Sequence, residues 1–325
     1  IKGLLKVVKK HDGLYKIHLR DEGRNFLPSV SAAISLARES GARTVISHLK
    51  AVGRGAWNDF PAALRMLREA QKDGVDISFD VFPYLRTGSM LASFLPSWVR
   101  VQKNDVILQY LSDKKKRAEI MAEIKNATLH SDRILFASAT GDKGIIGQTL
   151  AELSRRAALS PEEVILDILR INNLNVSIFG KTISARNLLM AAAEQGGIVA
   201  SNGAGYDTAF QRLGDLAHPR SFGAFPRFFR AISPLAKISL SDVITKMTSL
   251  PAKALGLRDR GVLKPNNVAD IAIFSPEEFK DLATYKNPYR YAAGLRHLLV
   301  SGEPAILNGE TMARRNGLIL RKKTR

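Results

Sequence analysis

The sequence contains no cysteine, which excludes disulfide bonds, thiolate metal ligands and a cysteine nucleophile. A chain without cysteine fits a reducing compartment, and we expect a cytoplasmic protein. No apolar run approaches the roughly 20 residues that a membrane-spanning helix needs, so we expect a soluble protein with no membrane partner. No signal peptide is recognisable. The chain begins at Ile1 and not at methionine, inside a structured-looking pattern, which indicates a fragment whose amino-terminal part is missing.

Acidic residues are few relative to basic ones: 30 Asp and Glu stand against 49 Lys and Arg, a formal net charge of +19. A basic balance of this size can accompany nucleic-acid binding. The positive residues, however, are spread along the whole chain, with short clusters only at residues 114–117 and 321–325. No basic stripe interleaved with aromatic residues is present. The distribution argues against nucleic acid as the partner and favours a solvated basic surface that suits anionic substrates.

Two histidines each lie at the end of a short apolar run. Residues 14–19 and 44–49 are predicted to form buried strands, and they contain His18 and His48. The segment between the two runs carries apolar residues at helical spacing and ends at Gly41, where a helix stop is expected. The histidines are 30 residues apart, about the length of one strand–helix–strand unit.

Parallel neighbouring strands would present both imidazoles at the same carboxyl-terminal edge, where α/β barrels build their active sites. Two neutral imidazoles that converge there suit one divalent metal ion, most often zinc. The alternative is that each is a core histidine with a hydrogen-bonded ring nitrogen. As a matched pair on consecutive strands, His18 and His48 favour the role of metal ligands.

A third strand is predicted at residues 75–82, with Asp80 and Tyr84 at its end. Two roles are open to Asp80: it orients a metal-bound histidine, or it satisfies a backbone amide. Further along, the segment HPRSFGAFPRFF predicts a loop over the same rim of the barrel. Its Arg220 has two possible partners as well, either a substrate carboxylate held by two hydrogen bonds or a structural salt bridge.

The fold class that we predict is α/β, with part of a barrel followed by a small β portion. Residues 1–259 would form the barrel part, interrupted by an irregular insertion at about 85–160 of the kind that serves as a lid or specificity wall. A solvated basic helix is the simplest account of its lysine run. From about residue 260 short apolar runs between turn sequences predict a β appendage, 260–325.

Six segments carry a resemblance to a known family, and they occur in that family's order: IHLRDEG, ISHLKAVG, FDVFPY, HPRSFGAFPRF, TSLPAKALGLRDRGVL and VADIAIF. The chain resembles the N-acyl-D-amino-acid deacylases, or D-aminoacylases, of the amidohydrolase superfamily. The matching segments cover most of residues 14–307.

The resemblance implies a metal-dependent, TIM-like (β/α)8 barrel with a β-sandwich portion, of which this chain holds the C-terminal half. It also implies a hydrolase of N-acyl-D-amino acids or related linear amides, acting on carbon–nitrogen bonds other than peptide bonds, with one or two zinc ions and a small N-acyl amino acid as substrate. Carried over by position, His18 and His48 are the metal ligands of the fifth and sixth strands. Lys50 and Tyr84 contact the substrate or polarise its carbonyl, and Arg220 belongs to the substrate end of the pocket.

The sequence departs from the family pattern in two respects. The first-strand ligands, His-x-His or His-x-Asp, and the residue that bridges the metals have no counterpart here, which indicates an amino-terminally truncated member. The general base expected at the end of the last strand, an aspartate, is replaced by Asn202, whose amide cannot accept a proton. Either Asp207, the nearest carboxylate, reaches in, or the protein is an inactive relative that serves as a ligand-binding or assembly protein.

Overall fold

The structure is a computed structural model that describes residues 1–125 and 130–321. Most of the basic cluster noted at residues 321–325 therefore lies outside the described residues. Within them, no helix is long and apolar enough to cross a lipid bilayer.

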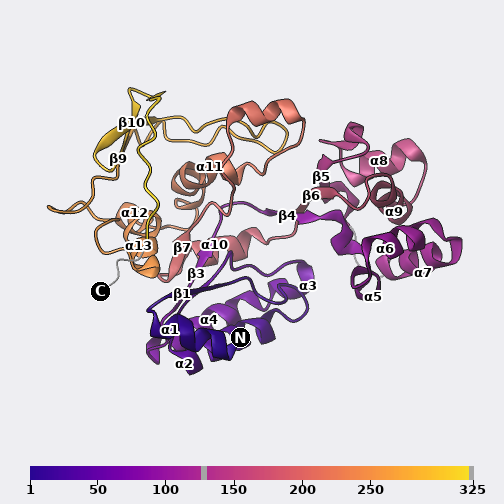
Figure 1. The fold of residues 1–325 in the computed structure, drawn as a ribbon, viewed down its shortest axis with the longest axis horizontal. Coiled ribbons are helices and arrows are strands. Elements are labelled where there is room, and N and C mark those ends of the chain that lie inside the picture. Colours follow the sequence, from indigo (N-terminus) through magenta and orange to yellow (C-terminus); the bar gives the residue numbers. More distant parts are fainter. Residues whose placement is uncertain (126–129, 322–325) are drawn as a thin grey trace.

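A four-stranded parallel sheet has the order β1-β2-β3-β7 and lies above the amino-terminal helices in Figure 1. In register, Ile17 lies beside Ile46, and Ile46 lies beside Phe79, so the carboxyl ends of the first three strands meet at one level. The predicted strand–helix–strand unit is confirmed. The strands are β1 (Leu14–Ile17), β2 (Arg43–Ile46), β3 (Ile77–Val81) and β7 (Gly197–Val199).

Helices cover one face of this sheet because their apolar stripes and the apolar strand residues form one buried cluster. Phe26 and Phe60 stack at 6.0 Å between ring centroids, joining the two largest helices. Gly41 ends the first of these in the left-handed conformation, as predicted. The GRGAW segment, residues 53–57, contains one helical turn. The helices of this region are α1 (Lys2–Lys10), α2 (Phe26–Ser40), α3 (Arg54–Trp57), α4 (Phe60–Lys72) and α10 (Ala185–Ala193).

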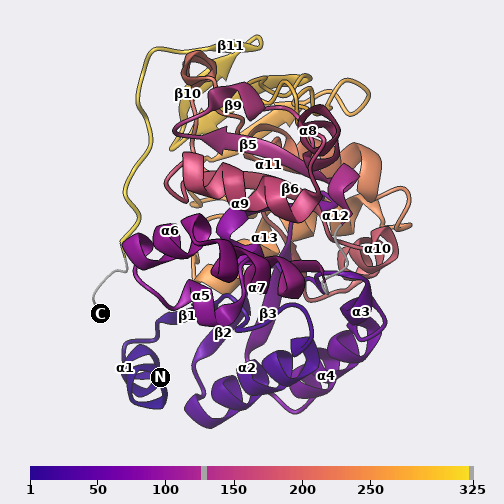
Figure 2. The same cartoon turned by 90° about the vertical axis from the view of Figure 1, so that its right-hand side faces the viewer.

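A separate unit with its own apolar cluster is inserted between β3 and β7, at the right of Figure 1 and facing the viewer in Figure 2. Its antiparallel sheet has the order β4-β6-β5. We predicted that the insertion ends at about residue 160. It extends further, because the central strand of its sheet is the third of the three strands along the chain. The strands are β4 (Arg86–Met90), β5 (Ile134–Ala139) and β6 (Val176–Lys181).

The helices of the inserted unit pack on that sheet and on one another. The lysine run opens one of them. Lys114 and Lys115 are exposed, as predicted for a solvated basic helix, while Ile120 and Ile124 pack its other face against the unit. Ser160 begins another with a capping box, in which Ser160 and Glu163 satisfy each other's backbone amides. The helices are α5 (Ser97–Arg100), α6 (Asn104–Ser112), α7 (Lys114–Lys125), α8 (Leu150–Ala157) and α9 (Pro161–Ile171), with short 3₁₀ turns η1 (Leu91–Phe94), η2 (Ser131–Arg133) and η3 (Lys143–Ile145).

The HPRSFGAFPRFF segment is a helix and not the predicted loop. Pro226 lies inside it, where proline removes a backbone hydrogen bond at a cost of about 3 kcal/mol. Burial of Ala224, Phe228 and Ile232 against Phe82 outweighs that cost, and a π-helical turn follows the proline. The elements here are η4 (Thr208–Leu213), α11 (Arg220–Arg227), η5 (Phe228–Ile232), α12 (Leu240–Met247) and α13 (Ser249–Leu255).

The carboxyl-terminal part forms a four-stranded antiparallel sheet in the order β11-β10-β9-β8, away from the inserted unit (Figure 1). The predicted boundary near residue 260 falls between α13 and the first of these strands. Ser301 with Gly302, and Asn308 with Gly309, form the two-residue turns between paired strands, and these residues have the positive φ that such hairpin turns require. The strands are β8 (Ile271–Phe274), β9 (Leu295–Val300), β10 (Glu303–Leu307) and β11 (Glu310–Thr311).

Candidate metal centre

His18 and His48 converge at the carboxyl edge of the parallel sheet. His18 directly follows β1, and His48 lies two residues beyond the end of β2. His18 Nδ1 and His48 Nε2 are 2.9 Å apart, and the ring centroids are 4.5 Å apart. The His18 side chain is 65% exposed and that of His48 only 11%. The structure thus brings together the two imidazoles that the sequence paired.

The backbone at His48 is held in an unusual conformation, with a φ of 41°. The carboxylate of buried Asp80 accepts a hydrogen bond from the His48 N–H at 2.7 Å, and its other oxygen lies 3.0 Å from Lys16 Nζ. Of the two roles predicted for Asp80, the structure shows the second, in which its carboxylate accepts a hydrogen bond from a backbone amide. That amide belongs to His48 itself, so Asp80 orients the imidazole through the main chain.

Glu22 completes the cluster, and the sequence did not single it out. Its Oε1 lies 3.1 Å from His48 Nδ1 and 4.0 Å from His18 Nε2. His18, Glu22 and His48 form a group that could hold a metal ion, with ligand atoms within 4.8 Å of one another. Two imidazoles and a carboxylate are a donor set that catalytic zinc sites use. One feature of the sequence could have identified Glu22: it is an acidic residue four positions after His18, the histidine that directly follows a strand.

Lys50 is buried behind His48, where its Nζ lies 2.5 Å from Glu22 Oε1 and 2.8 Å from His48 Nδ1. Burial lowers the pKa of Lys50, although Glu22 raises it. Burial raises the pKa of Glu22, but its contacts with His48 and with the Lys50 ammonium together outweigh this effect and leave that pKa lowered. Burial is also the largest cause that lowers the pKa of His18. At neutral pH the carboxylate is therefore ionised, and the His18 imidazole is neutral and keeps a lone pair that a metal ion could use.

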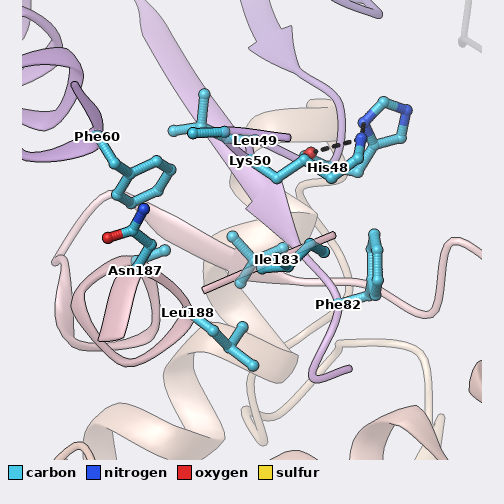
Figure 3. Close-up of a pocket in the computed structure, with 11 residues that line it drawn as sticks. His48, Leu49, Lys50, Phe60, Phe82, Ile183, Asn187 and Leu188 are labelled. Carbon is cyan, nitrogen blue, oxygen red and sulfur yellow. Dashed lines mark hydrogen bonds between the residues drawn. The ribbon is translucent and has the colours of Figure 1, made fainter. Parts of the chain in front are cut away.

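A small cavity of about 10 Å³ lies on the helix side of His48, with room for about one water molecule. Figure 3 shows the His48 ring pointing away from Phe60, Asn187 and Leu188, which line the cavity. The lining is mostly apolar, so this cavity belongs to the packing between sheet and helices. The imidazole of His48 faces away from it.

A second cluster, around Tyr84, lies at the start of α11. The Arg220 N–H donates to His218 Nδ1 at 3.1 Å, so Nδ1 is an acceptor and Nε2 carries the proton that it donates to the Arg86 carbonyl at 2.9 Å. Tyr84 is buried, packs edge-on against His218 and donates from its hydroxyl to the Pro219 carbonyl at 3.4 Å. Burial raises the pKa of Tyr84, so it stays a hydroxyl group.

Arg220 has no carboxylate partner among residues 1–125 and 130–321 in the structure, so the salt bridge that the sequence left open for it is absent. Its guanidinium lies over the Phe82 ring at 4.8 Å, and its Nε is buried without a hydrogen-bond partner. Burial lowers the pKa of Arg220. The positive charge of Arg220 in turn contributes to lowering the pKa of Lys50. An incompletely satisfied buried cation is suited to an anionic ligand.

Asn202 and Asp207 follow β7. Asn202 has a φ of 47°, a conformation that asparagine tolerates better than most residues. Asp207 is exposed, and its carboxylate accepts a hydrogen bond from the Ala209 N–H at 2.8 Å as the cap of η4. The Asp207 carboxylate is not part of the group formed by His18, Glu22 and His48. In this arrangement Asp207 serves as a helix cap.

Residues 187–306 match the model of the amidohydrolase family. Curated relatives from Alcaligenes xylosoxydans xylosoxydans include N-acyl-D-glutamate deacylase, 26% identical over 98% of this chain, and D-aminoacylase, 25% identical over 90%. The structure of N-acyl-D-glutamate deacylase from Bordetella bronchiseptica, complexed with zinc and a phosphonate inhibitor that mimics the tetrahedral intermediate, matches 99% of this chain and 58% of its own, with a TM-score of 0.78 and 23% identity.

The predicted resemblance is confirmed: the chain is a homologue of the N-acyl-D-amino-acid deacylases, and its fold is that of part of an amidohydrolase barrel. It spans 57% and 52% of the lengths of the two curated relatives, about half in each case.

The buried His218 predicts a dependence of stability on pH. Burial, with a smaller contribution from Arg220, lowers the pKa of His218 from 6.5 to about 3. Below pH 6.5, His218 binds a proton in the unfolded chain but stays neutral in the folded chain, so the free energy of unfolding decreases as the pH falls towards 3. Relative to His218→Gln, the wild type should lose about 1.4 kcal/mol of unfolding free energy per pH unit. Denaturant unfolding from pH 7 to 4 measures this, and parallel curves for the two proteins would contradict it.

Proposed function

We propose that the protein containing this chain is a divalent-metal-dependent hydrolase that deacylates N-acyl-D-amino acids or related linear amides, releasing a free amino acid and a carboxylate. The observation that supports this most is the 2.9 Å approach of His18 Nδ1 and His48 Nε2 at the carboxyl edge of parallel strands. The homology to deacylases of N-acyl-D-amino acids supports the reaction type.

The metal that we propose is zinc, as one or two ions, with His18 and His48 among its ligands. The solved relative contains zinc, and neutral imidazoles with a nearby carboxylate are ligands that zinc accepts. Zinc bound there would supply Lewis-acid chemistry at the scissile carbonyl. Lys50 provides a fixed ammonium next to His48 that can stabilise negative charge developing on the carbonyl oxygen.

The substrate that we propose is a small N-acyl amino acid whose α-carboxylate binds Arg220. The guanidinium is partly buried and lies over Phe82, and its Nε has no hydrogen-bond partner within the described part of the chain. A planar donor held in one orientation binds a carboxylate directionally, which would let the site distinguish D from L substrates. The Tyr84 hydroxyl, which donates to Pro219 O in this structure, is a second candidate contact for the substrate.

A second candidate function is that of an inactive relative retained for ligand binding or assembly. Asn202, in place of the expected aspartate, favours it, because an amide cannot accept a proton from the attacking water. Asp207 would have to leave its capping position to act in its place.

The proposal predicts that purified protein contains zinc and releases amine from N-acetyl-D-amino acids but not from the L enantiomers. Elemental analysis measures the metal, and an amine-detecting assay with both enantiomers measures the reaction. Treatment with a chelator should abolish the activity, and added zinc should restore it. Zinc-free protein that retains ligand binding would favour the inactive relative.

Replacement of Arg220 tests the carboxylate contact. In Arg220→Lys the bidentate donor is lost, and hydrogen bonds to charged groups contribute about 1.5–3 kcal/mol. We expect the KM for an N-acetyl-D-amino acid to rise about 10- to 100-fold, with a much smaller change in kcat. Arg65→Lys, on an exposed site of α4, is the matched control. An unchanged KM would remove Arg220 from substrate binding.

Restoring the carboxylate tests the importance of position 202. If the site lacks only its general base, Asn202→Asp should raise kcat by about two to four orders of magnitude. The asparagine-to-alanine variant is the control, because it also removes the amide but adds no base. Equal rates for wild type and Asn202→Asp in an active protein would mean that another group takes the proton.

A further inference from the structure

The two ring nitrogens of His48 face different surroundings. Nε2 points at His18 Nδ1, 2.9 Å away. Nδ1 points at an ion pair, with Lys50 Nζ at 2.8 Å and Glu22 Oε1 at 3.1 Å. Because an imidazole can offer only one nitrogen to a given ion, these surroundings decide on which side of the ring a metal binds.

The His18 side of the ring has the better geometry for a metal. Zinc–nitrogen bonds of about 2.0–2.1 Å in a tetrahedral site place two ligand atoms roughly 3.3 Å apart. His18 Nδ1 and His48 Nε2 would need to separate by only a few tenths of an ångström, and the His18 side chain is exposed enough to move.

The Glu22 side is already filled by a cation. The Lys50 ammonium contacts both Glu22 Oε1, at 2.5 Å, and His48 Nδ1. A metal ion bound by Glu22 and Nδ1 would have to displace this ammonium, which is buried and has its charge compensated there. Glu22 is therefore better placed to contact His48 than to contact the metal.

We infer that Glu22 is a positioning residue, which accepts the Nδ1–H of His48 and so leaves Nε2 free to bind the metal. This rests on the proposed metal site. In the structure Lys50 is the donor to Nδ1, and Nε2–H donates to His18. On metal binding one proton leaves Nε2 and one is taken up at Nδ1, so the ring stays neutral. The Lys50 ammonium then keeps its bond to Glu22 alone, and the carboxylate takes the Nδ1–H.

The Glu22 carboxylate favours the tautomer of His48 that carries its proton on Nδ1. A metal-bound histidine is held in one tautomer when its other nitrogen donates to a carboxylate, and loss of such a partner weakens metal binding about 10- to 100-fold. Glu22 is well suited to the role because its side chain is only 12% exposed and its other close partner is a cation that cannot accept the histidine proton.

The test is zinc affinity, measured by competition with a chromophoric chelator in the purified protein. Glu22→Gln should weaken binding about 10- to 100-fold, while Glu39→Gln, which removes an exposed carboxylate on α2, should leave it unchanged. Lys50→Met should not weaken binding, since the Glu22 carboxylate remains to accept the Nδ1–H. ¹⁵N NMR of the zinc-loaded wild type should show His48 protonated at Nδ1.

Two results would overturn the inference. One is an unchanged zinc affinity in Glu22→Gln. The other is a weakened affinity accompanied by a changed ligand-field spectrum of the cobalt-substituted variant, because Glu22 would then be a ligand itself. Failure of the proposed function gives a different pattern: zinc binds with the predicted dependence on Glu22, but no N-acyl-D-amino acid is hydrolysed. Absence of zinc binding in the wild type would overturn both.

Discussion

The parallel register of β1, β2 and β3 is the constraint on which the site depends. Since Ile17, Ile46 and Phe79 lie side by side, the residues that follow them emerge at one level of the sheet. His18 and His48, which follow β1 and β2, meet there with Asp80, which lies near the carboxyl end of β3. A slip of one residue in any pairing would turn one of these side chains to the helix-covered face. The helices α2 and α4 fix the register by burying the alternate residues.

The charged side chains of the candidate metal centre are arranged so that buried charges are paired. Glu22 and Lys50 are both largely withdrawn from water, and each compensates the other, because an unpaired buried charge is costly. Arg220 differs from this pair: it is partly buried and stacked on Phe82, and it has no carboxylate partner among the residues that the structure describes. The contrast separates groups that maintain the framework from a group left available to a ligand. His218 belongs to the framework, with both ring nitrogens used by the backbone.

The sequence predicted those parts of the fold that local patterns determine. Apolar runs and a helix of correct spacing located β1, α2 and β2, and the matched histidines followed from that unit. The sequence missed α11, because Pro226 and the aromatic residues around it look like a loop until their burial is known. It placed the end of the insertion too early, because β6 is central in space but last in sequence. Glu22 and the exact partner of Asp80 depend on contacts between separate connections, which periodicity does not report.

The left-handed backbone at His48 fixes, through the main chain, the direction in which the side chain of this proposed metal ligand leaves the backbone. The carboxylate of Asp80 accepts a hydrogen bond from the amide N–H of residue 48, a group that every residue except proline possesses. Any other side chain at this position would therefore start in the same direction. Asparagine and aspartate tolerate a positive φ and would keep this backbone, whereas valine and isoleucine, which resist positive φ, would strain it.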